Sequence, residues 1–146
     1  MTWRREYTQL TTATPEAVWK RWTTPEDWAI DDPDLREATF PVPVRVGAVG
    51  RVVNHGTPAQ KIVFTELQPG YAMNFRISLP GAALSFPHRM HVTPNGLSVT
   101  HAVEISGPLA KLYGLLVGRS IAAGLPAVVR LVTTNALADA VGWTTP

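Results

Sequence analysis

Two histidines on neighbouring predicted strands are the strongest candidates for chemistry in this chain. His88 lies in the alternating run Leu84 to Thr93, and His101 lies in the run Leu97 to Ser106. Because side chains alternate between the faces of a strand, each histidine shares its face with apolar residues. Burial among apolar groups lowers the pKa of an imidazole and keeps it neutral near pH 7. A neutral imidazole can donate and accept a proton, which suits general acid–base chemistry on a hydroxyl, carbonyl or enol group.

The turn Thr93-Pro94-Asn95-Gly96 determines how the two rings meet. If all four residues form the connection, His88 faces His101 directly, whereas a shorter Asn95-Gly96 turn makes them diagonal neighbours. Both alternatives bring the rings close enough to interact, directly or through a ligand or a water molecule. The competing interpretation is a pair of core histidines, each bonded to a backbone carbonyl or a neighbouring hydroxyl.

Other possible sites are weaker. Two histidines without a facing carboxylate make a poor zinc site, so no metal is expected. Asp31, Asp32 and Asp34 lack the glycine and the distal glutamate of a calcium-binding loop, and we interpret them as turn or capping residues. The segment Gly47–Gly50 stands among antiparallel strands and is no dinucleotide loop, so no cofactor is expected. The absence of cysteine excludes disulfides, thiolate catalysis and thiolate metal sites.

Length and composition indicate one globular domain, residues 1–146. The net charge is only +2 and no run of Lys or Arg could follow a phosphate backbone, which argues against nucleic acid as a partner. The N-terminus lacks the apolar segment of a signal peptide. Lys111, Arg119 and Arg130 interrupt the apolar C-terminal stretch, so no membrane span is expected. We therefore expect a cytoplasmic domain, and the sequence specifies no oligomeric state.

The elements that position the histidines begin with a strand and two short helices. Residues Trp3 to Thr12 are rich in β-branched and aromatic side chains, which favours a strand. The motif Thr-Pro-Glu then occurs twice, at Thr14-Pro15-Glu16 and at Thr24-Pro25-Glu26. Threonine is a good helix N-cap, proline suits the first helical position, and glutamate suits the positive end of the helix dipole. The spacing of the motifs predicts two short helices at an angle to each other.

Six strand-like runs follow, separated by segments rich in Pro, Gly and Asn, which favour turns. The connections are too short for the helical crossovers of a parallel sheet, so the runs predict an antiparallel meander or an incomplete barrel. The predicted strands are Leu35 to Phe40, Gly47 to Asn54, Gln60 to Leu67, Tyr71 to Leu79, Leu84 to Thr93 and Leu97 to Ser106.

The segment from Pro108 to about Ala140 has the period of an amphipathic helix. Its basic residues lie opposite the apolar sector, and Pro126 is expected to kink it. Gly114 and Gly118 form a stripe of small residues, which we interpret as a place of close packing on the sheet. The apolar sector contains Ala110, Val117, Ile121, Val128 and Val132, with Tyr113 and Leu125 at its edges.

This order of elements resembles the SRPBCC superfamily, whose START-like and birch-pollen-allergen-like members have the helix-grip fold. The sequence Ala13-Thr14-Pro15-Glu16-Ala17-Val18-Trp19 is similar to the entry to the family's first helix, and Glu66-Leu67-Gln68-Pro69-Gly70 resembles its strand-turn element. The segments Gly107-Pro108-Leu109-Ala110, Gly118-Arg119 and Gly124-Leu125-Pro126 resemble the terminal helix of the polyketide-cyclase-like bacterial branch. The resemblance implies an α+β fold in which a curved antiparallel sheet of about seven strands and a long C-terminal helix enclose a cavity.

In such a fold the sheet face toward the helix lines the cavity. We expect it to bind a small hydrophobic molecule. The resemblance implies a cofactor-free polyketide cyclase or dehydratase, and the inward position of His88 and His101 makes them the candidates for proton transfer. The alternative is a carrier or sensor whose histidines fix the polar end of a ligand. A third hypothesis is a partner protein that binds through the basic side of the terminal helix. The residues expected to contact the ligand are Tyr7, Tyr71, Met73, Phe75, Phe86, Met90, Val99, Tyr113, Val117 and Ile121, with Gln9 and Thr11 as further hydrogen-bond partners.

Overall fold

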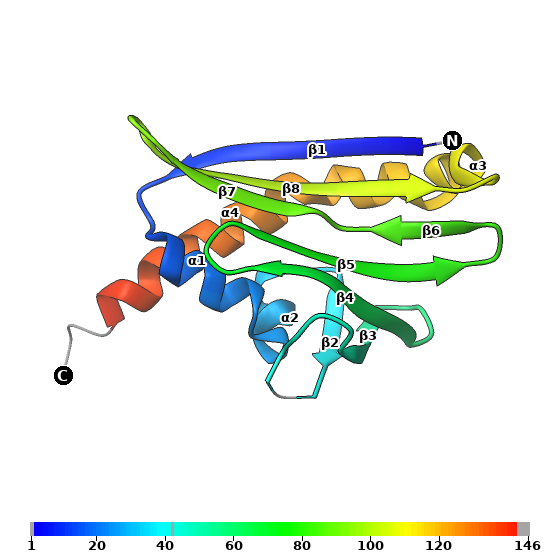
Figure 1. Ribbon diagram of the computed structural model, residues 1–146, viewed down its shortest axis with the longest axis horizontal. Coiled ribbons are helices and arrows are strands. Elements are labelled where there is room, and N and C mark those ends of the chain that lie inside the picture. The colour runs from blue at the N-terminus through cyan, green and yellow to red at the C-terminus, as the bar shows by residue number, and fades with distance from the viewer. Residues whose placement is uncertain (1, 42, 143–146) are drawn as a thin grey trace.

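The computed structural model describes residues 2–41 and 43–142, and side chains as far as residue 140. A curved antiparallel sheet is crossed on one face by the long C-terminal helix (Figure 1). The strands are β1 (Thr2–Thr11), β2 (Leu35–Thr39), β3 (Val49–Asn54), β4 (Gln60–Gln68), β5 (Ala72–Leu79), β6 (Ala82–Ser85), β7 (His88–Thr93) and β8 (Gly96–Ser106). The helices are α1 (Pro15–Trp22), the 3-10 turn η1 (Pro25–Asp27), α2 (Trp28–Asp31), α3 (Ala110–Tyr113), the π-helical segment η2 (Gly114–Gly118) and α4 (Arg119–Gly142).

The two short helices after β1 confirm the prediction, but they start differently. Thr14 caps α1, because its hydroxyl accepts a hydrogen bond of 3.2 Å from the backbone N–H of Ala17. The hydroxyl of Thr24 instead donates to the carbonyl of Lys20, and the second motif opens as the 3-10 turn η1 before α2 begins. The result is a bent pair of helices at one end of the sheet (Figure 1).

The sheet has eight strands in the described chain instead of about seven, because the predicted strand Leu84 to Thr93 divides at Phe86-Pro87. Pro87 has no N–H to donate to a strand partner, which interrupts the ladder. The N–H of Phe86 turns to the carbonyl of Phe75 and the side chain of Asn74, at 3.1 and 2.9 Å. The path through the sheet is β1-β8-β6-β5-β4-β3-β2, with β7 paired to β5 and β8.

The hairpin of β7 and β8 adopts the first of the two predicted registers. His88 pairs directly with His101, and Met90 pairs with Val99. The turn itself is Pro94-Asn95, and Thr93 and Gly96 are the paired strand residues on either side of it. Gly96 has a φ of +131°, a backbone conformation that favours glycine. The two imidazoles therefore face each other across the hairpin.

The terminal helix is continuous from Ala110, but it does not keep one helical period. The π-helical segment η2 inserts extra residues into a turn and shifts the face that meets the sheet. Gly114 and Gly118 pack on the ring of Trp3, and a Cβ atom on either glycine would lie 2.6 Å from that ring. The predicted close packing of the small-residue stripe is confirmed. Val117, expected in the apolar sector, is 38% exposed because of this shift in phase.

The helical stretch Ala110–Ala140 is long and apolar enough to cross a membrane by length and composition alone, and 22% of its most apolar window is buried. The three basic residues in it therefore do not by themselves exclude a span. In this fold α4 packs across β1 and β8 (Figure 1). Val129, Val132 and Ala136 are buried there, as expected for a helix that covers a sheet.

The core consists of two apolar clusters beneath the terminal helix. The first joins α1 and α4 to β4, β5, β7 and β8 and includes Val18, Trp22, Phe64, Met73, Met90, Val99 and Val129. The second contains residues of the strands β2 through β6, of β8 and of α3, and includes Leu35, Ile62, Ile77, Leu84, Ile105 and Ala110. The space between these clusters is not filled by side chains, and it contains the candidate site.

Candidate functional site

A cavity of about 590 Å³ lies between the sheet, α4 and the pair of short helices. It reaches both core clusters, because its wall includes Met73 and Val132 from the first and Leu35 and Leu84 from the second. Three stacked aromatic rings form part of its wall. Trp28 stacks on Phe75 with centroids 5.2 Å apart, and Phe75 stacks on Phe86 at 4.9 Å. The wall is thus mainly apolar and aromatic, with a few polar groups among the rings.

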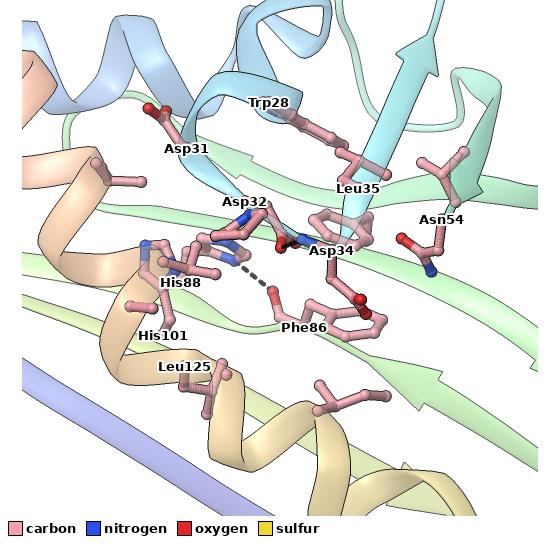
Figure 2. A pocket seen from close by; sticks show the side chains of 18 of the residues that line it. Trp28, Asp31, Asp32, Asp34, Leu35, Asn54, Phe86, His88, His101 and Leu125 are labelled. Carbon is pink, nitrogen blue, oxygen red and sulfur yellow. Dashed lines mark hydrogen bonds between the residues drawn. The ribbon is translucent and has the colours of Figure 1, made fainter. Parts of the chain in front are cut away.

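The cavity opens between the turn after α2 and the first half of α4. Pro33 and Asp34 are the exposed lining residues on the turn. Ala123, Gly124 and Ala127 are exposed lining residues on the helix. Small side chains on this part of α4 leave the opening free, and Figure 2 shows Asp34 on the opposite rim near Asn54. A ligand would enter past this rim toward the histidines.

His88 and His101 stand at the inner end of the cavity, with ring centroids 4.2 Å apart and an angle of 49° between the rings (Figure 2). Their residues are only 8% and 3% exposed. The ring of Trp22 contacts both histidines, edge-on to His88 at 5.3 Å and tilted to His101 at 5.7 Å. Phe75 lies 5.6 Å from His88. The pair is therefore enclosed by aromatic surface on the side away from the opening.

One nitrogen of each ring is bound to the protein, and these bonds define where the protons are. Nδ1 of His88 lies 2.5 Å from the carbonyl oxygen of Phe86 (dashed in Figure 2). A carbonyl only accepts, so this nitrogen carries the proton and Nε2 carries the lone pair. The indole N–H of Trp22 donates to Nε2 of His101 at 3.0 Å. An indole only donates, so in His101 the proton is on Nδ1.

The other two ring nitrogens, Nε2 of His88 and Nδ1 of His101, have no hydrogen-bond partner among the described residues. Within the same part of the chain, every side-chain nitrogen or oxygen atom that is itself buried has such a partner. The two unbonded ring nitrogens are therefore not buried atoms, and they are reached from the cavity that both rings line. The site offers one hydrogen-bond acceptor and one donor next to each other.

Burial keeps both imidazoles neutral. Desolvation lowers the pKa of His88 to about 4, against the opposing effect of the hydrogen bond to the Phe86 carbonyl. Desolvation also lowers the pKa of His101 well below its usual value, and the nearby His88 lowers it further. At neutral pH each ring can therefore either give or take a proton, as the apolar environment of the predicted strands indicated.

A second polar cluster, which the sequence interpretation missed, lies beside the pair. Arg21 of α1 binds both carboxylate oxygens of Asp31, with a shortest distance of 2.8 Å, and reaches Asp139 of α4 at 2.9 Å. Asn135 of α4 donates to Asp31 at 2.7 Å. The carboxylates hold the pKa of Arg21 above its usual value. The only sequence signal was the position of Arg21, three residues after Val18 on the buried face of α1.

Asp31, the last residue of α2, and Asp32, which follows it, have different roles. The interpretation of Asp31 as a turn or capping residue is wrong, because Asp31 is 3% exposed and paired with Arg21. Asp32 does have a turn role, since its carboxylate accepts the backbone N–H of Asp34 at 2.9 Å. Burial raises the pKa of Asp32, which also lines the cavity. The rim is thus acidic, while the inner end is neutral.

Six of the residues predicted for the site line the cavity together. They are Met73, Phe75, Phe86, His88, His101 and Ile121. Trp22 and Trp28, which the sequence analysis did not place in the site, also line it. The indole of Trp28 donates to the carbonyl of Trp22 at 3.2 Å, which holds the two rings in place.

Tyr71, Met90 and Val99 lie outside the cavity wall. Tyr71 is 49% exposed, because its N–H closes a turn onto Gln68 and the residue precedes the alternation of β5. Met90 and Val99 have the predicted inward orientation. They lie beyond the histidines under α1, where they are packed within the first core cluster.

The other three predicted residues make different contacts. The hydroxyl of Tyr7 donates to Gln9, and Gln9 donates to Thr133, so these side chains join β1 to α4 instead of facing a ligand. The hydroxyl of Thr11 accepts the N–H of Ala13. Tyr113 donates to the carbonyl of Pro80 at the start of the terminal helix. Val117 faces away from the cavity because of the π-helical segment.

Solved structures with the same fold are similar to this chain over nearly its whole length. The di-domain aromatase/cyclase StfQ of the steffimycin biosynthetic pathway has a TM-score of 0.76 at 14% identity, and the match covers 96% of this chain and 52% of StfQ. A point mutant of norcoclaurine synthase from Thalictrum flavum has a TM-score of 0.73 at 12% identity, covering 95% of this chain and 96% of the synthase. Ara h 8.0201 has a TM-score of 0.63 at 15% identity, and the match covers 92% of this chain and 99% of Ara h 8.0201.

No protein-family model and no curated protein sequence matches the chain. The three-dimensional comparison rests on the curved sheet, the paired short helices and the terminal helix, which are also the elements on which the sequence resemblance depended. The protein has an α+β helix-grip fold, as its sequence predicted.

Proposed function

We propose that the protein binds a small hydrophobic molecule in this cavity and acts on it as a cofactor-free cyclase or dehydratase, with His88 and His101 as the proton-transfer residues. One observation carries the proposal: two neutral imidazoles face each other in an aromatic cavity, and each has a nitrogen that the protein leaves free. The cavity volume is within the range of about 300–1,000 Å³ usual for small-molecule sites.

The proposed chemistry needs proton transfer and confinement only. In an aldol closure, a base removes a proton from the carbon next to a carbonyl, and the new carbon–carbon bond forms as the attacked carbonyl oxygen takes up a proton. In the dehydration that follows, a second C–H proton leaves, the hydroxyl departs as water, and a C=C bond forms. Neither step is a net oxidation or reduction of the substrate. An enclosed cavity brings the two ends of the substrate together. The description of StfQ as an aromatase/cyclase supports this reaction class.

Substitution of the histidines tests the catalytic part. With a candidate poly-β-ketone substrate, His88→Leu and His101→Leu should each lower turnover by roughly 10²–10⁴-fold, the usual contribution of a general acid or base. The matched control is His91→Leu, because His91 is exposed on the same strand. Unchanged turnover in both cavity variants would contradict the assignment.

Filling the cavity tests the binding part. Val128 lines it from α4, whereas Leu137 lies on the exposed surface of the same helix. Val128→Trp should abolish uptake of a hydrophobic probe such as 8-anilinonaphthalene-1-sulfonate, measured by native mass spectrometry, and Leu137→Trp should retain it. Equal uptake by both variants would show that the probe binds elsewhere.

The low pKa of His88 favours a second candidate function. A base with a pKa of about 4 is weak at neutral pH, so the same pair also suits a carrier or sensor that hydrogen-bonds the polar end of its ligand. In that case the histidine variants lower ligand affinity, and no turnover of any ligand is detected in the unaltered protein.

A further inference from the structure

The proposed function leaves open what each histidine does. We propose that the two rings have separate and fixed roles: Nε2 of His88 accepts a hydrogen from the ligand, and the Nδ1–H of His101 donates to a ligand oxygen. The site then selects molecules in which one carbon separates a hydroxyl-bearing carbon from a carbonyl carbon, with β-hydroxy ketones as the substrate class. This inference rests on the proposed function of the cavity.

The roles are fixed because the protein partners cannot be reversed. The carbonyl of Phe86 has no hydrogen to give, so it holds the proton of His88 on Nδ1. The indole of Trp22 has no lone pair to offer, so it requires the lone pair of His101 on Nε2. A change of tautomer in His101 would place two N–H groups against each other in a buried site and lose a hydrogen bond. Trp22 is therefore a positioning residue, because it acts on the ligand only through His101.

The geometry matches one small unit of a ligand. The ring centroids are 4.2 Å apart, a separation that suits two oxygens carried on a three-carbon unit. The stack of Trp28, Phe75 and Phe86 lies next to His88 and provides aromatic surface for an unsaturated carbon skeleton. A β-hydroxy ketone attached to such a skeleton would place its hydroxyl at His88 and its carbonyl at His101.

The assignment also gives a balanced route for dehydration. Nε2 of His88 removes a proton from the carbon between the carbonyl and the hydroxyl-bearing carbon, while His101 hydrogen-bonds the carbonyl oxygen and keeps its own proton. The protonated His88 then returns that proton to the hydroxyl group. The C–O bond breaks, water leaves and the C=C bond forms, and both imidazoles regain their starting tautomers. No oxidant or reductant takes part.

The first test measures the tautomers in the free protein. In ¹⁵N-histidine-labelled protein, two-bond ¹H–¹⁵N correlations should show the Nδ1–H form for both His88 and His101. Trp22→Phe keeps an aromatic ring but removes the indole N–H, so it should shift the nitrogen signals of His101 toward the Nε2–H form and leave His88 in place. Trp28→Phe is the control, because that indole donates to a backbone carbonyl and bonds neither histidine. An Nε2–H form of His101 in the unaltered protein, or no shift in Trp22→Phe, would overturn the assignment.

The second test measures ligand selection with a matched set of probes. 4-Hydroxy-4-phenylbutan-2-one has both groups, 4-phenylbutan-2-one lacks the hydroxyl, and 1-phenylbutan-1-ol keeps that hydroxyl but lacks the carbonyl. Loss of either group should weaken binding about 2- to 10-fold, the net effect of one hydrogen bond. His88→Leu should erase the preference for the hydroxyl, and His101→Leu the preference for the carbonyl.

The outcomes separate the inference from the proposed function. Equal binding of the three probes would overturn the assigned roles while the binding function stands. Binding of none of them, together with no uptake of the hydrophobic probe, would overturn both. Selective binding without turnover would support the assigned roles in a carrier and contradict the catalytic part of the proposed function.

Discussion

Two buried polar clusters lie beside the same cavity, and they differ in one respect. In the ion cluster, formed by Arg21, Asp31, Asn135 and Asp139, the side chains bind one another and leave no buried polar atom without a partner. In the imidazole pair, formed by His88 and His101, each ring has one nitrogen without a partner in the described part of the chain. One cluster is closed and charged, and the other is open and neutral.

This difference separates a structural role from a functional one. The ion cluster joins α1, α2 and α4 and so sets the distance between the short helices and the wall of the cavity. Its capacity for hydrogen bonds is used within the protein. Each ring of the imidazole pair has one nitrogen that is reached from the cavity and bonds no described residue, and such a nitrogen stabilises nothing in the free protein. The comparison predicts opposite responses to the removal of each cluster.

The largest effect is expected from opening the ion cluster. Arg21→Leu leaves the buried carboxylate of Asp31 with Asn135 as its remaining partner, and the free energy of unfolding should fall by about 3–5 kcal/mol. Urea denaturation measures this loss. The matched control is Arg4→Leu, whose exposed pairs with Glu6 and Glu104 should contribute less than about 1 kcal/mol. Equal losses in the two variants would contradict a special role of the buried cluster.

Acid should act on the imidazole pair next. The pKa of His88 is about 4 in the folded protein and near 6.5 in the unfolded chain, so the unfolded chain binds more protons between these values. Stability should therefore be constant above about pH 6.5 and fall by about 3 kcal/mol as the pH drops to 4. His101 acts in the same direction, and Asp32 acts in the opposite one because its pKa is raised.

Denaturation curves of the unaltered protein and of His88→Leu between pH 4 and pH 7 measure this effect. In the variant, the free energy of unfolding should depend on pH less strongly than in the unaltered protein, because the contribution of His88 is removed. His91→Leu should keep the dependence of the unaltered protein, since that ring is exposed on β7. A curve for His88→Leu that matches the unaltered protein would show that other groups cause the acid sensitivity.

The sequence predicted the fold and the meeting of the histidines well, and for a physical reason. Strand alternation and turn residues are local signals, and together they placed His88 either opposite or diagonal to His101 on the inward face, of which the structure has the first. The division of the strand at Pro87 also had a local signal, since proline has no N–H to donate, but alternation of apolar residues across it concealed the break. Local patterns were therefore sufficient for the framework and for the central pair.

The partners of the histidines depend on contacts between distant segments, which no local pattern carries. Trp22 looked like a core residue of a short helix, and its bond to His101 exists only because α1 crosses the hairpin. Arg21 was not singled out and Asp31 was interpreted as a turn or capping residue, but α4 covers both. Val117 was misplaced because the helical wheel assumes one period, while packing of Gly114 and Gly118 on Trp3 accompanies a π-helical turn.

The contact of Gly114 and Gly118 with Trp3 is separate from both polar clusters, and disturbing it should change stability by a smaller amount. Gly118→Ala should lower the free energy of unfolding by about 1–3 kcal/mol, because its Cβ atom would meet the rigid ring of Trp3. Gly124→Ala on α4 is the control, since its Cβ atom would meet nothing within 4 Å, and it should stabilise the helix by about 0.5–1 kcal/mol. Thermal or urea unfolding of both variants measures the difference, and equal changes would contradict the close packing.

The smallest effect is expected where the function would be lost. His88→Leu at pH 7 exchanges a desolvated imidazole with one free nitrogen for an apolar side chain, and it removes only the hydrogen bond to the Phe86 carbonyl. These changes offset each other, so the free energy of unfolding should stay within about 1 kcal/mol of the unaltered value. Because Arg21→Leu introduces the same side chain beside the same cavity, the two variants compare directly in one denaturation experiment. A loss of 3 kcal/mol or more in His88→Leu would place the imidazole pair with the ion cluster, as a part of the framework, and would remove the reason to regard its free nitrogens as reserved for a ligand.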